Sequence, residues 1–439
     1  MEVRKETGKE AGREVSKEAG KEVRRPVWAE VSLSALTENF EAIRRYVNPA
    51  NEKRATPRKV LSIVKGNGYG HGGPEVARVL EKAGSDWFGV TCTEEGIALR
   101  EAGVRNPTLV LTGFVPGEES RLVEHDLTAT IHRCEQLPLL EDAAARFCSG
   151  RSLDRYADRK TRTSDLASHA SEFASQNPVP FHLKIDTGMN RLGIATSEID
   201  AFARQLAKCR HLELTGIFSH FASSEVFTDT AVGKQTREQE EHFYAALERL
   251  RALGIDPGVV HLANSAAIVS RPETWADMVR PGAILYGYHP GYDPIEKRDE
   301  AEQLLPLKPV MSLRTKIINL RDVPAGAGVG YDAAFVTKRP SRIAVLAAGY
   351  GDGFHRSLGN RGSLLVRGKL APIVGIVSMD VTMIDVTDIE GVQVGDVATL
   401  YGSDGGHVIP ANRVARSIGT VTSDLLCAVT QRVQRLYVP

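Results

Sequence analysis

The sequence predicts an α/β protein in which a (β/α)8 TIM barrel precedes a C-terminal all-β domain. The first observation is the alternation, between about residue 26 and residue 300, of short β-branched apolar runs with segments of helical periodicity. The second is a change of pattern after residue 300. There the apolar runs are separated by Gly, Asp and Pro, and one helical segment, PANRVARSIG, interrupts them. Strands that alternate with helices are typical of a parallel barrel, whereas strands joined by turn residues are typical of all-β domains.

The expected barrel strands recur along the first two thirds of the chain. They are residues 60–64, 86–90, 108–112, 127–131, 181–185, 214–218, 258–262 and a last run near 278–286. Two of the intervening helical segments end at Gly84 and Gly254, because glycine readily adopts the left-handed conformation that ends many helices. We therefore assign residues 26–300 to the barrel and residues 301–439 to the β-domain.

Two segments depart from this pattern. In residues 1–25, glutamate recurs every four residues with lysine or arginine interleaved, which favours a helix, but three glycines oppose one. We expect a mobile, at most partly helical tail, with a partner-binding helix as the alternative. Residues 149–178 are rich in Ser, Arg, Asp and Ala and are expected to form a surface insertion before the fifth strand.

Composition excludes several classes of protein. The 439 residues carry a formal charge of zero, and no basic patch is interleaved with aromatic residues, so nucleic acid is not an expected partner. No apolar run reaches transmembrane length, and residues 1–25 have no secretory core. The five cysteines lack metal-ligand spacing, which favours reduced thiols in the cytoplasm and no metal site. They are Cys92, Cys134, Cys148, Cys209 and Cys427.

A lysine and a glycine-rich turn follow the first expected barrel strand. Lys65 comes directly after the apolar run, and glycine occupies five of the eight positions 66–73. So many glycines indicate a backbone with positive φ or one that closely approaches a bound group. A lysine at the end of a buried strand is partly desolvated, which lowers the pKa of its amine and makes it nucleophilic. The alternative for these residues alone is a solvated lysine before a flexible turn.

Polar residues also follow four other expected strands, and the carboxyl ends of barrel strands form the active-site rim. A buried core histidine and a surface arginine are structural alternatives for single members, but their coincidence at one rim indicates a site. The four groups are Asp186 to Arg191, Ser219-His220, Asn264-Ser265 and Arg280-Pro281-Gly282.

The last two groups suit a phosphate. Phosphate sites in such barrels commonly lie after the seventh and eighth strands, on backbone N–H groups. Ser265 and the N–H groups of Gly282 and Ala283 fit that role. A phosphate site opposite a lysine on the first strand is what pyridoxal phosphate (PLP) requires.

The segment VKGNGYGHG closely resembles the PLP-lysine motif of alanine racemases, which combine a TIM barrel with a β-domain. The family usually has alanine where Gly66 and Gly68 stand. KIDTGMNRLG, SHFA, HLANSA and VRPGAILYG are similar to the successive motifs of the same family. The resemblance spans about residues 26–439.

The resemblance implies a role for each matching residue. Arg191 would bind the substrate carboxylate. Arg280 would face the pyridine nitrogen and, because arginine retains its proton, leave that nitrogen unprotonated. Lys184 matches a position that many members carry as a carbamate, with an ion pair to Asp186 as the alternative. The residues implied to bind the cofactor are Lys65, Tyr69, His220, Asn264, Ser265, Arg280, Gly282, Ala283 and Ser423.

Racemisation needs a second acid/base, and Tyr331 in AGAGVGYDAAF matches the catalytic tyrosine of the family. Free tyrosine titrates near pH 10, so His220 and Arg280 are the candidates that would lower its pKa. In the family this tyrosine reaches across a homodimer together with the residue that matches Met379, and Tyr350 matches a residue of the entrance. A tyrosine in a glycine-flanked turn is the alternative.

One departure from the family affects the phosphate. Where members commonly carry a tyrosine whose hydroxyl touches the phosphate, this chain has Ser423. Serine is shorter, so its contact with the phosphate would need a bridging water.

The resemblance implies a PLP-dependent alanine racemase. Lys65 would act on D-alanine and Tyr331 on L-alanine, and D-alanine for peptidoglycan would be the product. A broad-specificity or serine racemase is the nearest alternative. A decarboxylase would lose the carboxylate that Arg191 is expected to hold, and a non-catalytic PLP-binding protein would usually lack the β-domain.

Overall fold

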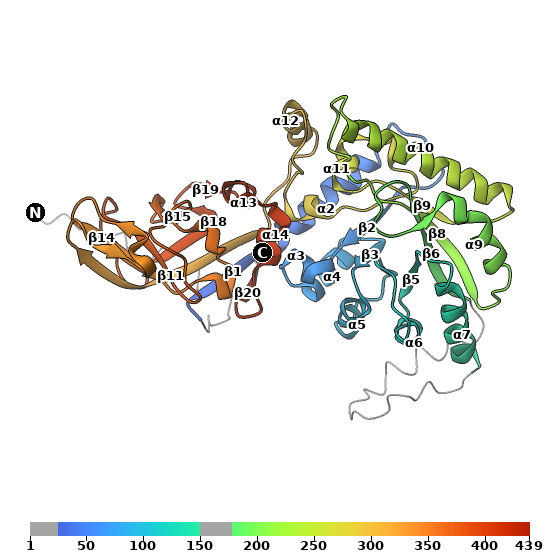
Figure 1. Ribbon diagram of the computed structural model, residues 1–439, viewed down its shortest axis with the longest axis horizontal. Helices are drawn as coiled ribbons and strands as arrows, with labels where there is room; N and C mark the ends of the chain where they lie inside the picture. Colours follow the sequence, from blue (N-terminus) through green and yellow to red (C-terminus); the bar gives the residue numbers. More distant parts are fainter. Residues whose placement is uncertain (1–24, 150–177) are drawn as a thin grey trace, which may run out of the picture.

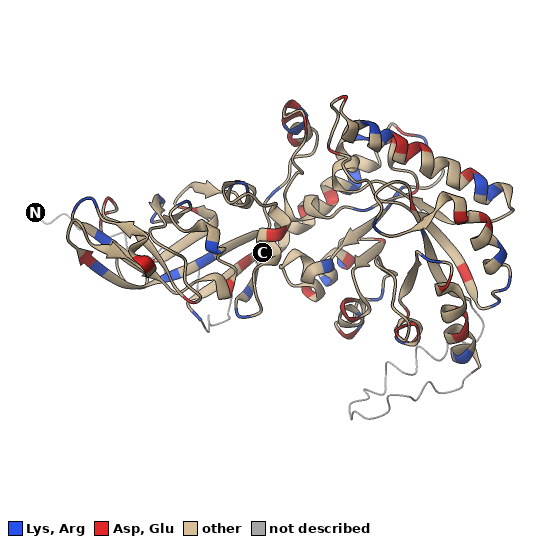
Figure 2. Ribbon diagram, in the orientation of Figure 1, with Lys and Arg blue, Asp and Glu red and all other residues tan. Residues whose placement is uncertain are grey.

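The computed structural model describes residues 25–149 and 178–439. The expected tail and surface insertion therefore lie, apart from their end residues, outside the described residues. Figure 1 shows a helix-covered barrel and a β-domain side by side along the longest axis. Basic and acidic residues are interspersed along the ribbon of both parts (Figure 2), in keeping with the formal charge of zero. No helix within the two described ranges is long and apolar enough to cross a membrane.

Eight parallel strands of the described chain form the barrel, which confirms the predicted fold class. Their spatial order is β10-β2-β3-β4-β5-β6-β8-β9, and the short strand β7 (Ile194–Ala195) pairs with β6. Backbone hydrogen bonds from Asp277 N to Val260 O and from Arg280 N to Ala263 O, both 3.0 Å, join the two ends. The strands are β2 (Lys59–Ile63), β3 (Trp87–Val90), β4 (Thr108–Val110), β5 (Thr128–Ile131), β6 (Val179–Asp186), β8 (Leu212–Phe218), β9 (Val259–His261) and β10 (Met278–Val279).

The eighth strand is shorter than expected. The apolar run near 278–286 continues to Tyr286, but β10 ends at Val279 and the segment Ala283–Tyr286 forms the 3₁₀ helix η3. Pro281 contributes to this end, because proline has no N–H to donate to a neighbouring strand. Arg280 and Gly282 consequently lie in the loop after the strand, at the rim.

Helices cover the outside of the barrel (Figure 1). The N-cap of α10 is Thr230, whose side chain accepts a hydrogen bond from Gly233 N. As predicted, Gly84 and Gly254 follow helices with positive φ, of 94° and 75°. The helices are α2 (Leu33–Val47), α4 (Gly73–Lys82), α5 (Thr93–Glu101), α6 (Glu119–Glu124), α7 (Gln136–Cys148), α9 (Ile199–Leu206), α10 (Ala231–Ala252), α11 (Ser265–Ser270) and α12 (Glu296–Leu304).

The β-domain is mainly antiparallel, and its central path runs β16-β15-β18-β11-β1-β20. β14 pairs with β11 and β17, β19 pairs with β18, and β12 pairs with β13. The strands are β11 (Met311–Val323), β12 (Gly328–Val329), β13 (Phe335–Val336), β14 (Ser341–Leu346), β15 (Ser363–Val366), β16 (Lys369–Pro372), β17 (Thr382–Asp385), β18 (Val397–Asp404), β19 (His407–Ile409) and β20 (Gln434–Val438). Two helices, α13 (Ala411–Ser417) and α14 (Thr422–Cys427), precede β20.

The first strand of the described chain belongs to this second sheet, although residue 26 was expected to begin the barrel. β1 (Val27–Ser32) pairs antiparallel with β11 and parallel with β20. Its apolar residues Val27, Ala29 and Val31 are fully buried. A short buried strand looks the same in either sheet, so the local sequence pattern does not reveal this pairing. β1 thus pairs with the last strand of the chain, β20, directly before the first helix of the barrel, α2.

Candidate active site

The glycine-rich turn after β2 has the backbone that its sequence predicts. Gly66, Asn67 and Gly68 adopt left-handed conformations with φ of 62°, 54° and 64°, within the segment α3 (Lys65–Tyr69). The carboxylate of Glu95, on α5, accepts hydrogen bonds from Gly66 N at 2.7 Å and from Asn67 N at 3.3 Å. A side chain of the next βα unit therefore holds the start of the turn.

Lys65 is half-buried, and its surroundings destabilise the protonated, positively charged form of its amine. Burial lowers its pKa below the ordinary lysine value, the charge of Arg191 lowers it further, and Glu95 acts in the opposite direction. The neutral, nucleophilic form of the amine is therefore more populated than in a solvated lysine.

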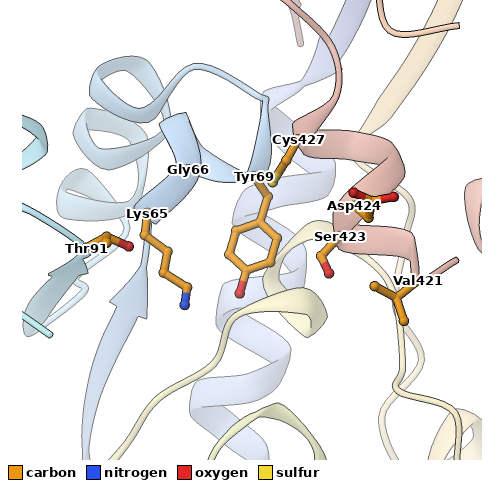
Figure 3. Close-up of a pocket in the computed structure, with 8 residues that line it drawn as sticks. All are labelled: Lys65, Gly66, Tyr69, Thr91, Val421, Ser423, Asp424 and Cys427. Carbon is orange, nitrogen blue, oxygen red and sulfur yellow. The ribbon is translucent and has the colours of Figure 1, made fainter. Parts of the chain in front are cut away.

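A cavity of about 390 Å³ lies between Lys65 and the C-terminal segment. In Figure 3, Lys65 and Tyr69 stand on one wall, and Ser423, on α14, points toward Tyr69 from the other. The sequence thus brings Ser423 into the same cavity as Lys65. The lining residues are Lys65, Gly66, Tyr69, Thr91, Val421, Ser423, Asp424 and Cys427.

Polar groups converge beside Gly282. Its N–H donates a hydrogen bond of 2.8 Å to Ser265 Oγ. A Cβ at position 282 would lie 2.7 Å from the Tyr69 hydroxyl and 3.6 Å from Ser265 Oγ, so only glycine leaves this space open. Burial raises the pKa of Tyr69 to about 12, which keeps its phenol protonated as a hydrogen-bond donor. The structure thus brings together Tyr69, Ser265 and Gly282, three of the residues that the sequence predicts around a phosphate; we call them the cradle.

Asn264 is engaged in local structure. Its Oδ1 accepts hydrogen bonds from Ala266 N and Ala267 N, both at 3.1 Å, which caps α11, and a third from Ser224 Oγ at 2.8 Å. Asn264 therefore fixes the start of the helix on which Ser265 stands.

Arg280 is buried and binds carbonyl oxygens rather than a carboxylate. Its Nη2 donates to Ser219 O at 2.7 Å and to Leu262 O at 2.9 Å, and its Nη1 donates to His261 O at 2.8 Å. Its Nη2 also lies 3.4 Å from His220 Nδ1. Burial lowers the pKa of Arg280 to about 9, so the guanidinium stays charged at neutral pH.

Lys184 is buried in the barrel, and among the described residues no carboxylate forms an ion pair with it. Burial, followed by the charges of Arg191 and Arg280, lowers its pKa to about 8. Asp186, the expected partner, instead accepts three backbone N–H bonds of 3.0–3.1 Å in the following turn. Across the described residues, no ion pair within 4.0 Å joins Lys184 to Asp186. Arg191 is exposed at the end of that turn.

Tyr331, Tyr350 and Met379 do not line this cavity in the single chain. They lie on the β-domain with exposed fractions of 68%, 42% and 51%. Tyr350 N donates to Ser378 O at 2.9 Å, which places Tyr350 beside the segment that carries Met379. The structure thus keeps the predicted second base apart from Lys65 within one chain.

Sequence reasoning missed Glu95 and Cys427. Glu95 lies two residues into α5, directly after β3, and could have been found as a carboxylate at a strand end. Cys427 Sγ lies 3.4 Å from where a Cβ at Gly66 would stand. No local motif relates Cys427 to Gly66, because the two residues lie more than 350 positions apart in the sequence.

A partly desolvated lysine and a polar cluster of Tyr69, Ser265 and Gly282 lie where the barrel strands end, in a chain that joins an α/β barrel to a β-domain. This arrangement defines a two-domain α/β-barrel enzyme. The family model "Alanine racemase, N-terminal domain" matches residues 31–290, and "Alanine racemase, C-terminal domain" matches residues 310–437. The chain therefore belongs to the alanine racemase family.

Relatives and solved structures agree with this assignment. The alanine racemase of Geobacter sulfurreducens is 38% identical, with 94% of this chain and 97% of the relative covered. Alanine racemase 2 of Caldanaerobacter subterraneus is 36% identical over 94% of this chain and 95% of the relative. The structure of alanine racemase from Clostridium difficile 630 superposes with a TM-score of 0.79 at 29% identity, covering 95% of this chain and 97% of that one. Alanine racemase from Bacillus anthracis with bound L-Ala-P gives 0.79 at 30% identity, over 95% and 96%.

Proposed function

We propose that this chain is a PLP-dependent alanine racemase that interconverts L-alanine and D-alanine, with Lys65 and Tyr331 as the two bases. The observation that carries the proposal is the pairing of a desolvated Lys65 amine with the polar cluster of Tyr69, Ser265 and Gly282 at the end of the barrel strands. We further propose that the product serves peptidoglycan synthesis, a role typical of the family. The five cysteines are free thiols, which supports a cytoplasmic location.

The residues of the cradle fit the phosphate of PLP. Tyr69 and Ser265 offer hydroxyls, and the missing Cβ of Gly282 leaves space for the phosphate beside them. When bound, PLP supplies an electron sink that stabilises negative charge at the substrate Cα. Lys65 would hold the cofactor aldehyde covalently and then move the Cα proton on its own side. Ser423 lines the same cavity as Tyr69, and its short side chain would reach the phosphate through a bridging water.

Arg280 would hold the pyridine end of the cofactor. The backbone carbonyls and His261 occupy Nη1 and Nη2, while Nε has no hydrogen-bond partner among the described residues. The guanidinium can only donate, so a ring nitrogen beside Nε would act as the acceptor and stay unprotonated. A weaker electron sink of this kind favours return of the proton over transfer of the amino group.

Arg191 would bind the substrate carboxylate, and Lys184 would be the carbamate that orients it. The lowered pKa of Lys184, about 8, leaves a larger fraction of its amine neutral. A neutral amine attacks carbon dioxide, forming an N–C bond and releasing one proton, and the product is an anion. Such an anion would be attracted by the positive charges of Arg191 and Arg280, whereas the unmodified lysine cation is repelled by them.

The second base would come from a second copy of the chain. Tyr331 is two-thirds exposed and, with Tyr350 and Met379, places large apolar side chains on the surface of the β-domain. Exposed groups of this kind are typical of interfaces. We propose a homodimer in which these residues complete the cavity of the partner, so that each site uses Lys65 of one subunit and Tyr331 of the other.

Chiral analysis of single L-amino acids incubated with the purified protein and PLP tests this function. We expect L-alanine to be converted to an equal mixture of enantiomers. Comparable turnover of serine and other amino acids would instead support a broad-specificity racemase. Release of carbon dioxide would support a decarboxylase. Cofactor binding without any conversion would contradict the proposal and favour a non-catalytic PLP-binding protein.

A further inference from the structure

One arginine outside the cavity connects its two walls. Within residues 25–149 and 178–439, the guanidinium of Arg435, on β20, donates to four backbone carbonyl oxygens and to no carboxylate. Its Nε binds Gly70 O at 2.9 Å, and its Nη2 binds Val429 O at 2.6 Å. Its Nη1 binds Thr430 O at 2.6 Å and Val433 O at 2.7 Å. The side chain is partly buried, so these bonds are only partly replaceable by water.

The carbonyls that Arg435 binds belong to different parts of the site. Gly70 ends the left-handed turn that begins at Lys65 and carries Tyr69. Val429 and Thr430 follow α14, which carries Ser423 on the opposite wall. A single cation therefore joins the lysine wall of the cavity to the α14 wall, which lie more than 350 residues apart in the sequence.

The two walls meet through backbone, which leaves little room for independent movement. A Cβ at Gly70 would lie 2.2 Å from Leu426 O, and φ at Gly70 is 81°. A Cβ at Gly72 would lie 2.0 Å from the hydroxyl of Tyr437, which is on β20. The turn can approach the C-terminal segment this closely only because these positions are glycine.

We propose that Arg435 is a positioning residue that sets the separation between the Lys65 turn and α14, and thereby the affinity of the site for its cofactor. Arginine suits this task because its planar fork offers five N–H donors in fixed directions, and four carbonyls lie around it. Lysine offers a single donor group and cannot span the same acceptors. The identity of the cofactor rests on the proposed function, but the positioning role does not.

Arg100 provides a matched control. Like Arg435 it binds four backbone carbonyls, although it is buried rather than partly buried. It lies on α5, and the residues that it binds do not line the cavity. Its acceptors are His125 O at 3.2 Å, Val104 O at 3.1 Å, Asn106 O at 2.9 Å and Asp126 O at 2.8 Å. Arg100→Lys thus measures the general cost of replacing such an arginine.

The test compares Arg435→Lys with Arg100→Lys in three measurements on the full chain. These are the melting temperature, the dissociation constant of PLP from the apoprotein, and amide hydrogen exchange across residues 66–72 without cofactor. We expect the melting temperature of both variants to be lower than that of the wild type. Only Arg435→Lys is expected to weaken PLP binding by about tenfold or more and to accelerate exchange in the turn, because a charge-assisted hydrogen bond to the turn is lost. Arg100→Lys should keep PLP affinity within about twofold, because none of the residues whose carbonyls it binds lines the cavity.

Gly70→Ala serves as a second variant because it forces the walls apart while keeping the guanidinium. It should weaken PLP binding in the same direction. The inference is overturned if Arg435→Lys or Gly70→Ala binds PLP like the wild type, or if Arg100→Lys loses as much affinity as Arg435→Lys. If the wild-type protein did not bind PLP, the proposed function would fail, while unchanged exchange in the Arg435→Lys turn would still decide against the positioning role.

Discussion

Arg280 Nη1 lies 3.1 Å from His261 Nδ1, and this contact fixes the protonation of the buried histidines beneath the site. A guanidinium can only donate, so Nδ1 of His261 accepts and its Nε2 carries the proton. That nitrogen lies 3.0 Å from Nδ1 of His182. Burial lowers the pKa of both histidines, that of His182 to about 3. Both imidazoles therefore stay neutral, and the positive charge remains on Arg280.

Replacing His261 with phenylalanine is expected to loosen Arg280. The change removes one acceptor of the buried guanidinium, which should lower the free energy of unfolding by about 1–3 kcal/mol. The absorbance of the bound cofactor should also shift, because Arg280 would no longer be held at one distance from the ring. Thermal unfolding and absorbance spectra check this, with His407→Phe as a control at an exposed histidine. An unchanged spectrum would show that His261 does not position Arg280.

Gly282→Ala is expected to close the phosphate cradle. The added Cβ would lie 2.7 Å from the Tyr69 hydroxyl, so either Tyr69 moves or the space for the phosphate is lost. We expect PLP affinity to fall by about tenfold or more, as for one lost hydrogen bond to a charged group. Gly291→Ala is the control, because a Cβ there meets no atom within 4 Å. Equal affinities of the two variants would contradict the cradle.

The stability of the protein is expected to depend on pH through Lys184. Its folded-state pKa of about 8 lies below the ordinary value of 10.5, so the unfolded chain binds this proton more tightly. The free energy of unfolding should therefore rise between pH 8 and pH 10.5, by at most ~3 kcal/mol, and the gain should be absent below pH 8. Denaturant unfolding in buffers free of carbon dioxide, with wild type and Lys184→Met, measures the difference. If the difference in unfolding free energy between wild type and Lys184→Met does not grow with pH, Lys184 is not a desolvated amine with a lowered pKa.

The barrel and the β-domain are predictable because the spacing of apolar residues within short segments distinguishes strands from helices. The left-handed turn at Gly66–Gly70 is predictable for a similar reason, since three of its five residues are glycine, which adopts positive φ at low cost. The pairing of β1 with β11 and β20, and the contact of Arg435 with Gly70, are different. They depend on residues far apart in the sequence, and a buried strand or an arginine carries no local mark of its partner.

Tyr331→Phe removes a single hydroxyl from an exposed side chain, so the fold should be unaffected. We expect racemisation to fall by about 10²- to 10⁴-fold, the usual contribution of a general acid or base, with no change in the melting temperature or in PLP binding. Tyr437→Phe is the matched control, because its hydroxyl lies against Gly72, behind the turn. Full activity of Tyr331→Phe would remove Tyr331 from the mechanism.

The most direct test of the central claim mixes two inactive variants, Lys65→Ala and Tyr331→Phe, and measures alanine racemisation after the subunits have exchanged. If each site combines Lys65 of one subunit with Tyr331 of the other, each mixed dimer contains one intact site. Half of the dimers are then mixed, so we predict recovery of about a quarter of wild-type activity. Recovery should vanish when the subunits are cross-linked before mixing. A mixture that stays as inactive as its components would contradict the shared two-base site.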